Sequence, residues 1–254
     1  MDIPRFNVLG VGVHAVNLST ATAYLIQRAR DKTTGYVCCC DAHSITRARG
    51  SEHHRRTLNQ ALLATPDGMP LVWAGQRSGH DHVGRTYGPD LMESICAATA
   101  ETELTHYFYG GGENTAADLV TKLQGRFPGL KVVGHESPPW QEDATRLATA
   151  GIVHASADFV WIGLSTPKQE AFMAHFHRQP DSRGITLGVG AAFDFLSGRV
   201  KQAPVGWQKA GFEWLWRLGQ EPGRLAKRYL ITVPSFGSRL LAQRLGVIKF
   251  PIDD

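Results

Sequence analysis

The chain of 254 residues is poor in cysteine, with four in all, and three of these are consecutive at positions 38–40. This spacing fits neither a zinc site nor a disulfide framework, so a reducing compartment is expected. No apolar run reaches the roughly 18–20 residues that a membrane-spanning helix needs. The N-terminus also lacks the basic and apolar segments of a secretory signal. We therefore expect a cytoplasmic protein.

Several ligand-binding signatures are missing too. The segment Leu9-Gly10-Val11-Gly12-Val13-His14 does not complete G-x-G-x-x-G, and no Walker sequence occurs. There is no Asp-x-Asp pair, and the eleven histidines match no metal-binding pattern. We therefore favour a site without metal or other cofactor. An NAD-binding redox or regulatory domain is the main alternative function, and the incomplete glycine signature counts against it.

What is present is a regular alternation of apolar and amphipathic segments. The composition, 43% hydrophobic and 20% charged, is that of a globular protein. The expected strands are Phe6–Val13, Tyr36–Cys40, Leu62–Ala64, His106–Tyr109, Lys131–Val133, Phe159–Ile162 and Thr186–Val189. Helices are expected near 19–30, 43–60, 69–78, 89–103, 114–126, 141–151 and 168–178. This order predicts an α/β fold, with a Rossmann-like, mostly parallel sheet flanked by helices.

The character of the sequence changes after Gly198. Residues 199–249 contain ten Lys and Arg but only two acidic residues, whereas residues 1–198 contain 17 basic and 19 acidic ones. No strand is expected here, and Pro234 is expected to separate two helices. We therefore divide the chain into a core, 1–198, and a basic helical appendage, 199–254. An anionic partner is expected at the appendage.

The basic residues of the appendage are spaced for a common surface. Arg217, Arg224, Lys227 and Arg228 fall close to one helical face if their two helices run nearly in line. Neighbouring tryptophans make this surface suitable for an anionic membrane. A single-stranded nucleic acid or a merely solvated face are alternatives, but no nucleic-acid-binding module is recognisable. In the core, Arg85 can clamp a phosphate or carboxylate, although a solvated surface arginine is the commoner outcome.

One aspartate stands between a predicted strand and a predicted helix. Residues 62–70 form a buried strand, a tight turn enclosed by Pro66 and Gly68, and a helix start. The turn places Asp67 at the carboxyl end of its strand, where open α/β sheets bind ligands. A carboxylate there can act as a general base toward a substrate hydroxyl. The alternative is that Asp67 only caps the following helix.

Two glycine-containing segments also follow predicted strands. In Gly110-Gly111-Gly112-Glu113 the backbone N–H groups can approach a phosphate, although a plain strand–helix turn explains the segment as well. Residues 188–198 are rich in small side chains, which permit a ligand to approach closely. Asp194 within them can accept hydrogen bonds from ribose hydroxyls. Tight helix–sheet packing and helix capping are the respective alternatives.

A third loop contains the block Gly163-Leu164-Ser165-Thr166-Pro167-Lys168-Gln169-Glu170. A helix start explains Thr166 as the N-cap, Pro167 as the first helical residue and Glu170 as the partner in a capping box. The helix start gives no role to Gln169 or Lys168. The Gln169 amide can bind a sugar hydroxyl, and Lys168 can bind a phosphate.

Together these segments resemble the WecG/TagA/CpsF glycosyltransferase family over nearly the whole chain. The resemblance is carried by four blocks: Thr65-Pro66-Asp67-Gly68-Met69-Pro70, Thr166-Pro167-Lys168-Gln169-Glu170, Gly188 to Gly198, and Ala203-Pro204 followed by Gly211-Phe212-Glu213-Trp214-Leu215-Trp216-Arg217-Leu218. It continues through Glu221-Pro222-Gly223-Arg224-Leu225 to Arg228-Tyr229-Leu230. Four blocks in the right order are far more specific than any one of them. The resemblance implies an inverting transferase that moves a sugar from a UDP-sugar to a polyprenyl-diphosphate-linked saccharide. It also implies a peripheral protein at the cytoplasmic face of the membrane, and a homo-oligomer is possible.

The resemblance also implies roles for individual residues. Asp67 matches the family's proposed base, and Arg85 and Gln169 match its pocket residues. Arg217, Arg224 and Lys227 match the appendage cations thought to reach the nucleotide or the lipid diphosphate. The expected substrate contacts are Cys39, Asp41, Gly110, Gly111, Gly112, Glu113, Pro139, Gly163, Thr166, Lys168, Gly190, Asp194, Arg217, Arg224 and Lys227.

One departure from the family pattern concerns the donor sugar. Many members have Thr-x-Asn after the second strand, where this chain has Cys39-Cys40-Asp41. Asp41 retains the capacity to bind a sugar hydroxyl, but Cys39 lacks the hydroxyl group. This change leaves N-acetylmannosamine uncertain as the donor sugar. A second carboxylate near Asp67 is also expected to raise the pKa of Asp67.

Overall fold

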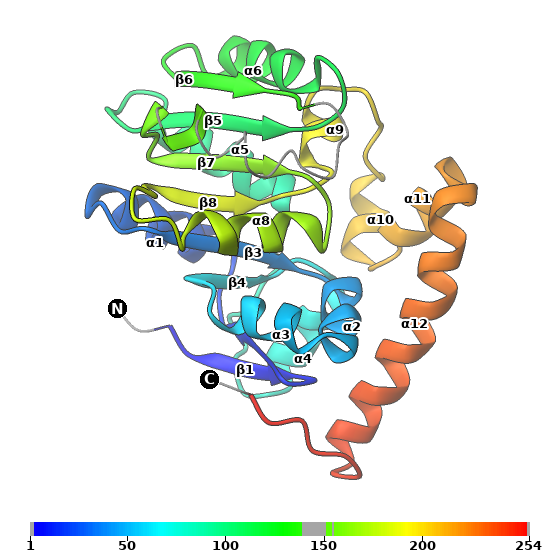
Figure 1. The fold of residues 1–254 in the computed structure, drawn as a ribbon. Helices are drawn as coiled ribbons and strands as arrows, with labels where there is room; N and C mark the ends of the chain where they lie inside the picture. Colours follow the sequence, from blue (N-terminus) through cyan, green and yellow to red (C-terminus); the bar gives the residue numbers. More distant parts are fainter. Residues whose placement is uncertain (1–2, 139–150, 154, 253–254) are drawn as a thin grey trace.

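The computed structural model describes residues 3–138, 151–153 and 155–252. Pro139 and most of the helix expected at 141–151 lie outside the described residues. The remaining elements form an α/β fold with a long helix near the C-terminus (Figure 1). The predicted fold class is confirmed.

The centre of the fold is a six-stranded sheet in which every pair of neighbouring strands is parallel. Its strands are β3 (Gly35–Cys40), β4 (Leu63–Pro66), β5 (Thr105–Gly110), β6 (Lys131–Glu136), β7 (Phe159–Gly163) and β8 (Ile185–Gly188). Their order is β4-β3-β8-β7-β5-β6. All six carboxyl ends therefore meet at one edge, and Figure 1 shows the strand arrows pointing toward the C-terminal helices.

Helices cover both faces of this sheet. They are α1 (Leu18–Arg30), α2 (Ala42–Gly50), α3 (Glu52–Asn59), α4 (Met69–Gln76), α5 (Gly88–Thr99), α6 (Thr115–Arg126), α8 (Lys168–Phe176) and α9 (Ala192–Leu196). Because side chains alternate along a strand, Cys38 and Cys40 join the core under α2, α3 and α8. Cys39 faces the opposite core, under α1, α5 and α6. The three consecutive cysteines are thus buried strand residues with free thiols.

Two predicted elements are divided in the structure. The strand expected at Phe6–Val13 is an antiparallel hairpin of β1 (Arg5–Val8) and β2 (Val11–His14) beside the main sheet. Leu9 and Gly10 both have positive φ and form its turn. The helix expected at 43–60 is two helices, because Ser51 has extended backbone and its hydroxyl accepts from the N–H of His54 at 3.2 Å.

The C-terminal segment contains α10 (Val205–Lys209), α11 (Glu213–Gln220) and α12 (Pro222–Arg244). The break expected at Pro234 is wrong, because α12 continues through it. Proline removes one helical hydrogen bond, but Pro234 and Leu230 are both exposed. Water can therefore bond the carbonyl oxygen that loses its partner. The helix runs along the carboxyl edge of the sheet (Figure 1).

The far end of the C-terminal segment is tied to the first hairpin. The Asn7 side chain donates to the carbonyl oxygen of Phe250 at 2.6 Å, and Gln243 accepts from the N–H of Leu9 at 2.9 Å. The ring of Phe250 is buried beneath the guanidinium of Arg49. Phe250 and Phe236 belong to the same core cluster as the hairpin. The division of the chain at Gly198 stays a prediction, and these contacts show that the two parts share a core.

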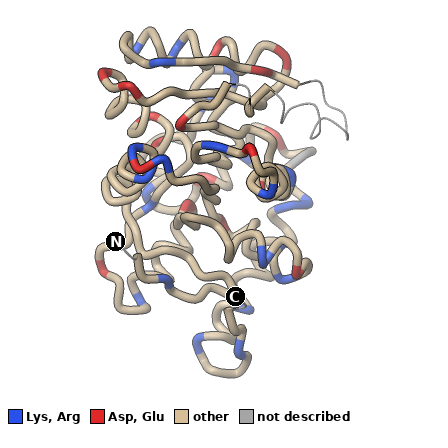
Figure 2. The backbone as a smooth tube through the Cα atoms, turned by 60° about the vertical axis from the view of Figure 1, so that its left-hand side comes forward, with Lys and Arg blue, Asp and Glu red and all other residues tan. Residues whose placement is uncertain are grey.

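No helix within the described residues is long and apolar enough to span a bilayer. Figure 2 shows basic residues on both the α/β part and the C-terminal helices, with acidic residues interspersed. Some basic residues of the C-terminal segment pair with core acids: Arg199 with Asp118 at 2.8 Å and Arg228 with Asp41 at 3.1 Å. The excess charge of the segment is therefore partly used to hold it against the core.

Candidate active site

A cleft with two lobes lies between the carboxyl edge of the sheet and the C-terminal helices. The larger lobe has a volume of about 500 Å³ and the smaller one of about 120 Å³. Asp41, Asp67, Tyr87 and Arg217 line both, so the lobes meet around these four residues. The smaller, polar lobe lies over the ends of β3, β7 and β8. The larger, apolar lobe lies between α4 and α12.

Asp67 is placed at the junction of the two lobes. It follows β4, and its N–H donates to the carbonyl oxygen of Cys40 at the end of the neighbouring β3 at 2.9 Å. The N-cap of α4 is Gly68 and has no side-chain cap bond, so the capping role considered for Asp67 is wrong. The carboxyl group of Asp67 is available to a ligand.

The environment of Asp67 favours a protonated carboxyl group near neutral pH. Its pKa is raised from 3.8 to about 8, mainly by burial; the Arg85 charge opposes this rise, and the negative charges of Asp41 and Glu213 add to it. The expected contribution of Asp41 has the predicted sign, but desolvation is the larger cause. A pKa in this range suits a general base that must accept a proton and later release it.

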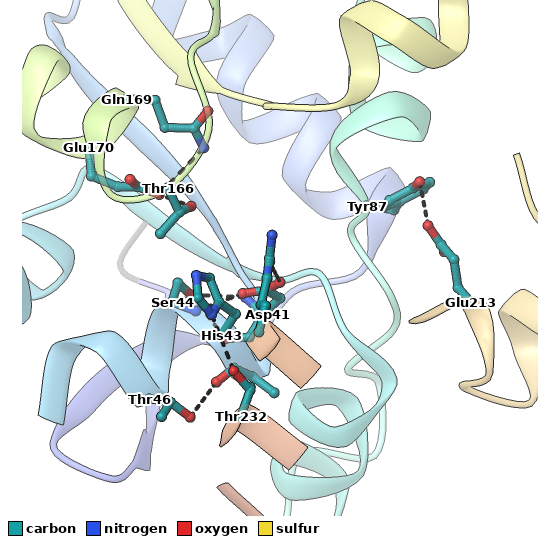
Figure 3. Close-up of polar contacts among 12 residues, drawn as sticks. Asp41, His43, Ser44, Thr46, Tyr87, Thr166, Gln169, Glu170, Glu213 and Thr232 are labelled. Atoms are coloured by element: carbon teal, nitrogen blue, oxygen red, sulfur yellow. Dashed lines mark hydrogen bonds and ion pairs between the residues drawn. The ribbon is translucent and has the colours of Figure 1, made fainter. Parts of the chain in front are cut away.

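A second carboxylate, Glu213 of α11, is fixed beside this junction. It accepts from the guanidinium of Arg85 and from the hydroxyl of Tyr87, the latter at 2.7 Å (Figure 3). Arg85 also donates to the backbone carbonyl of Asp67 at 3.0 Å and stacks on the Tyr87 ring at 3.9 Å. Arg85 is thus a half-buried bridge between the core and the appendage, and the solvated position considered for it is wrong.

Asp41 connects the polar lobe to α12. One carboxylate oxygen caps α2 by accepting from the N–H of Ser44 at 2.7 Å, and the other accepts from Arg228 at 3.1 Å. His43 in the same turn contacts the hydroxyl of Thr232 at 3.2 Å (Figure 3). Burial and the nearby Arg228 charge lower the pKa of His43 to about 4, so its imidazole is neutral at pH 7. These contacts hold α12 over the site.

The block before α8 contributes a buried polar group. Thr166 does not cap the helix, since α8 begins after Pro167 without a side-chain cap. Its hydroxyl instead donates to the Glu170 carboxylate at 2.8 Å, and the Gln169 amide donates to the same oxygen at 3.4 Å (Figure 3). Gln169 is buried, and its amide oxygen has no hydrogen-bond partner within the described residues. Because Gln169 lines the polar lobe, this oxygen can accept a hydrogen bond from a ligand.

Two glycines make room at the strand ends. Gly110 has φ of +133°, and a Cβ there would lie 2.6 Å from the carbonyl oxygen of Gly163 on β7. At Gly188 a Cβ would lie 2.7 Å from Met173 and 3.1 Å from the amide nitrogen of Gln169. Side chains at these positions would displace the walls of the polar lobe.

Most of the predicted site residues line the cleft. The polar lobe is lined by Cys39, Asp41, Asp67, Gly111, Gly163, Thr166, Gln169, Gly190, Asp194 and Arg217, and the apolar lobe by Asp41, Asp67, Arg85 and Arg217. Neither lobe has Gly110, Gly112, Glu113, Lys168 or Lys227 in its lining. Pro139 and the side chain of Arg224 lie outside the described residues. The N-cap of α9 is Ala191, so the capping role considered for Asp194 is wrong.

The appendage cations do not share one face. A non-helical Glu221 separates α11 from α12, so Arg217 and Arg228 reach the polar lobe from two helices. Lys227 is exposed and lines neither lobe. Within the described residues the Nε atoms of Arg217 and Arg228 are buried without hydrogen-bond partners. Two guanidinium groups with unused donors therefore border the polar lobe.

Comparison with known proteins decides the family. The model of the Glycosyl transferase WecG/TagA/CpsF family matches residues 6–249. This chain belongs to that family. A Bacillus spizizenii protein named N-acetylglucosaminyldiphosphoundecaprenol N-acetyl-beta-D-mannosaminyltransferase is 27% identical over 194 residues, covering 76% of this chain and 74% of that protein. A Bacillus subtilis protein of the same name is 25% identical over 228 residues, covering 89% and 87%.

The match confirms the expected WecG/TagA/CpsF family and with it a glycosyltransferase. Family membership does not support the alternative of an NAD-dependent redox domain. Within the part of the chain that the structure describes, no group of three or more His, Cys, Asp or Glu is arranged to hold a metal ion. A metal-independent reaction stays a prediction.

Two functional candidates were not among the predicted site residues. Glu213 was noted only within a family block, and Tyr87 was not singled out. Their signal is weak in the sequence because Tyr87 and Glu213 are separated by 126 positions and meet only after α11 docks on the core. The one hint in the sequence is that Glu213 is one of only two acidic residues in a basic segment, and in the structure it pairs with the core residue Arg85.

Proposed function

We propose that this protein is an inverting glycosyltransferase that moves a sugar from a UDP-sugar to a polyprenyl-diphosphate-linked saccharide in cell-surface polysaccharide synthesis. The observation that carries the proposal is the position of Asp67, where a polar and an apolar lobe meet. A reaction between a nucleotide-sugar and a lipid-linked acceptor needs one compartment for each substrate. The relatives named above carry an undecaprenol-linked acceptor in their names.

The donor fits the polar lobe. Glycines at the strand ends allow the nucleotide to approach the backbone, and Asp194 offers a carboxylate to ribose hydroxyls. Gln169 offers a buried acceptor atom to a hydroxyl or amide hydrogen of the donor. Arg217 and Arg228 border the same lobe, and their charges stabilise the diphosphate as it leaves. Because these two cations can neutralise the leaving diphosphate, they favour a reaction that needs no divalent metal.

The chemistry is a single displacement. Asp67 removes the proton from an acceptor hydroxyl as that oxygen forms a bond to the anomeric carbon. The bond between this carbon and the diphosphate oxygen breaks on the opposite side, and UDP leaves with the electron pair. The configuration at the anomeric carbon is therefore inverted. Arg85 holds the turn that carries Asp67 through its bond to the backbone carbonyl.

The appendage brings this site to the membrane, where the lipid-linked acceptor resides. Leu230 and Leu241 of α12 and Leu245 at its C-cap are 76%, 57% and 69% exposed, which is unusual for leucine. Basic residues such as Lys227 and Arg239 are exposed on the same helix. Apolar and cationic side chains together bind the surface of an anionic bilayer without crossing it. We therefore propose a peripheral protein on the inner face of the cell membrane.

The decisive experiment compares the wild type with Asp67→Asn in a transfer assay. A panel of UDP-sugars, beginning with UDP-N-acetylmannosamine, is offered with a short-chain lipid-diphosphate saccharide. We expect Asp67→Asn to bind UDP normally while turnover falls at least ~100-fold, the scale for loss of a general base. Glu101→Gln, an exposed carboxylate remote from the cleft residues, is the control. Near-normal turnover of Asp67→Asn would remove Asp67 from this role.

Membrane docking has its own test. Leu230→Ser with Leu241→Ser should reduce sedimentation with vesicles that contain phosphatidylglycerol. Val133→Ser serves as the matched control, because Val133 is also an exposed apolar residue, at 45%, but lies on β6. Equal sedimentation of both variants would show that α12 is not the docking surface.

A further inference from the structure

The apolar lobe is formed by one stripe of α12 facing α4. From α12 it is lined by Tyr229, Thr232, Val233, Phe236, Gly237, Leu240 and Arg244, and from α4 by Met69, Pro70 and Trp73. The α12 positions recur every three or four residues, so they follow one side of the helix over four turns. The lobe is thus a long groove, and its length runs along the helix axis.

This groove is continuous with the reaction centre. Asp41, Asp67, Arg85 and Glu213 line its inner end. Arg77 and Arg244 line its outer end, but between them and the reaction centre the walls at Trp73, Phe236 and Leu240 are hydrocarbon, with the open backbone at Gly237. A saccharide would leave its hydroxyl groups without hydrogen-bond partners there, which is costly in an apolar cavity. The occupant of this part is therefore apolar and connected to a polar group near Asp67.

We infer that the groove binds the first isoprene units of the acceptor's polyprenyl chain. The inference rests on the proposed function, since it assigns a site to one part of the proposed acceptor. The volume of about 500 Å³ accommodates the start of such a chain and not its whole length. The remainder leaves beside Leu241 and Leu245, which are exposed at the C-terminal end of α12. The enzyme therefore recognises its acceptor by the lipid as well as by the saccharide.

The structure offers a substitution that fills the groove and spares the fold. A Cβ added at Gly237 would meet no atom within 4 Å, and its φ is not positive. Gly237→Leu therefore places a side chain into open groove space. A Cβ added at Gly223 would also meet no atom within 4 Å, and Gly223 lies on the same helix but does not line the groove. Gly223→Leu is the matched control.

The experiment measures transfer to two acceptors that carry the same saccharide diphosphate, one on a farnesyl chain and one on a short straight alkyl chain, without vesicles. For Gly237→Leu we expect KM for the farnesyl acceptor to rise at least about tenfold, the scale for crowding an apolar pocket. KM for the alkyl acceptor and for the UDP-sugar should stay unchanged. Gly223→Leu should behave as the wild type with both acceptors.

The outcomes separate this inference from the proposed function. If the wild type transfers to both acceptors but Gly237→Leu matches Gly223→Leu, the groove does not bind the isoprenoid chain. If the wild type shows equal KM for the two acceptors, the enzyme does not recognise the isoprene units, and the inference is also overturned. If the wild type transfers sugar to neither acceptor from any UDP-sugar, the proposed function itself fails. A rise in KM confined to the farnesyl acceptor supports the inference.

Discussion

The ionisation of Asp67 predicts a pH-dependent stability that its substitution should abolish. In the folded protein burial raises its pKa from 3.8 to about 8. Between these values the folded protein holds a proton that the unfolded chain has released, so stability falls as pH rises. Asn cannot ionise. Asp67→Asn should therefore lose less stability than the wild type as pH rises.

The magnitude follows from the shift. A difference of about four pKa units, at about 1.4 kcal/mol each, gives a full effect of about 6 kcal/mol. This destabilisation grows above pH 4 and is complete once the pH exceeds the folded value. Between pH 5 and pH 8 the wild type should lose on the order of 4 kcal/mol relative to Asp67→Asn. That is a large share of the 5–15 kcal/mol or so that stabilises a typical domain.

The assay is urea unfolding at pH 5, 6, 7 and 8 for the wild type, Asp67→Asn and Glu101→Gln. The difference in unfolding free energy between the wild type and Asp67→Asn should widen steadily over this range, whereas Glu101→Gln should follow the wild type. Parallel pH profiles of the unfolding free energy for all three proteins would refute the statement that Asp67 keeps its proton in the folded protein at these pH values. The same titration predicts that kcat/KM increases with pH and levels off above about 8, because only the ionised carboxylate accepts a proton.

Three further predictions concern other parts of the site. Glu213→Gln should weaken the bonds from Arg85 and Tyr87. Because Glu213 raises the pKa of Asp67 and Arg85 lowers it, removing the Glu213 charge should lower this pKa. The midpoint of the pH profile of kcat/KM should therefore shift to lower pH, with Glu101→Gln as the control. Gly188→Ala should raise KM for the UDP-sugar, since the methyl group would displace the Gln169 amide, and an unchanged KM would place the donor elsewhere. Phe250→Ala should destabilise the protein by about 3–5 kcal/mol in urea unfolding, and a loss below 1 kcal/mol would mean that the tail is not docked in solution.

The sheet and most of the cleft could be predicted because their signals are local. Apolar runs ended by Gly, Pro or Asp gave strands β3 to β8 within a few residues, and parallel pairing brings their ends to one edge. Asp41, Asp67 and Asp194 all follow such strand ends, and all three line the polar lobe. Local pattern therefore located the core half of the site.

What the sequence could not supply are the features that depend on tertiary contacts. The path of α12 through Pro234 depends on solvent at one side of the helix, and the hairpin near Gly10 depends on a turn hidden in an apolar run. The pairing of Glu213 with Arg85 joins residues 128 positions apart. Capping rules favoured Thr166 and Glu170 as a helix start, but their side chains bond each other beside the polar lobe, which Thr166 lines. Propensity cannot foresee which partner a polar side chain finds.

The contacts that hold the C-terminal helices on the core have a consequence for biosynthesis. Proteins emerge from the ribosome N-terminus first, and the sheet can form before the last helices appear. The cleft around Asp67, however, is walled by Arg217, Tyr229 and Phe236, and α12 is held on the core by Arg228 at Asp41 and by Gln243 at the first hairpin. A nascent chain that ends before α11 therefore leaves the Asp67 carboxylate uncovered at the edge of the sheet. The reaction space is enclosed once α11 and α12 have been synthesised and have docked on the core.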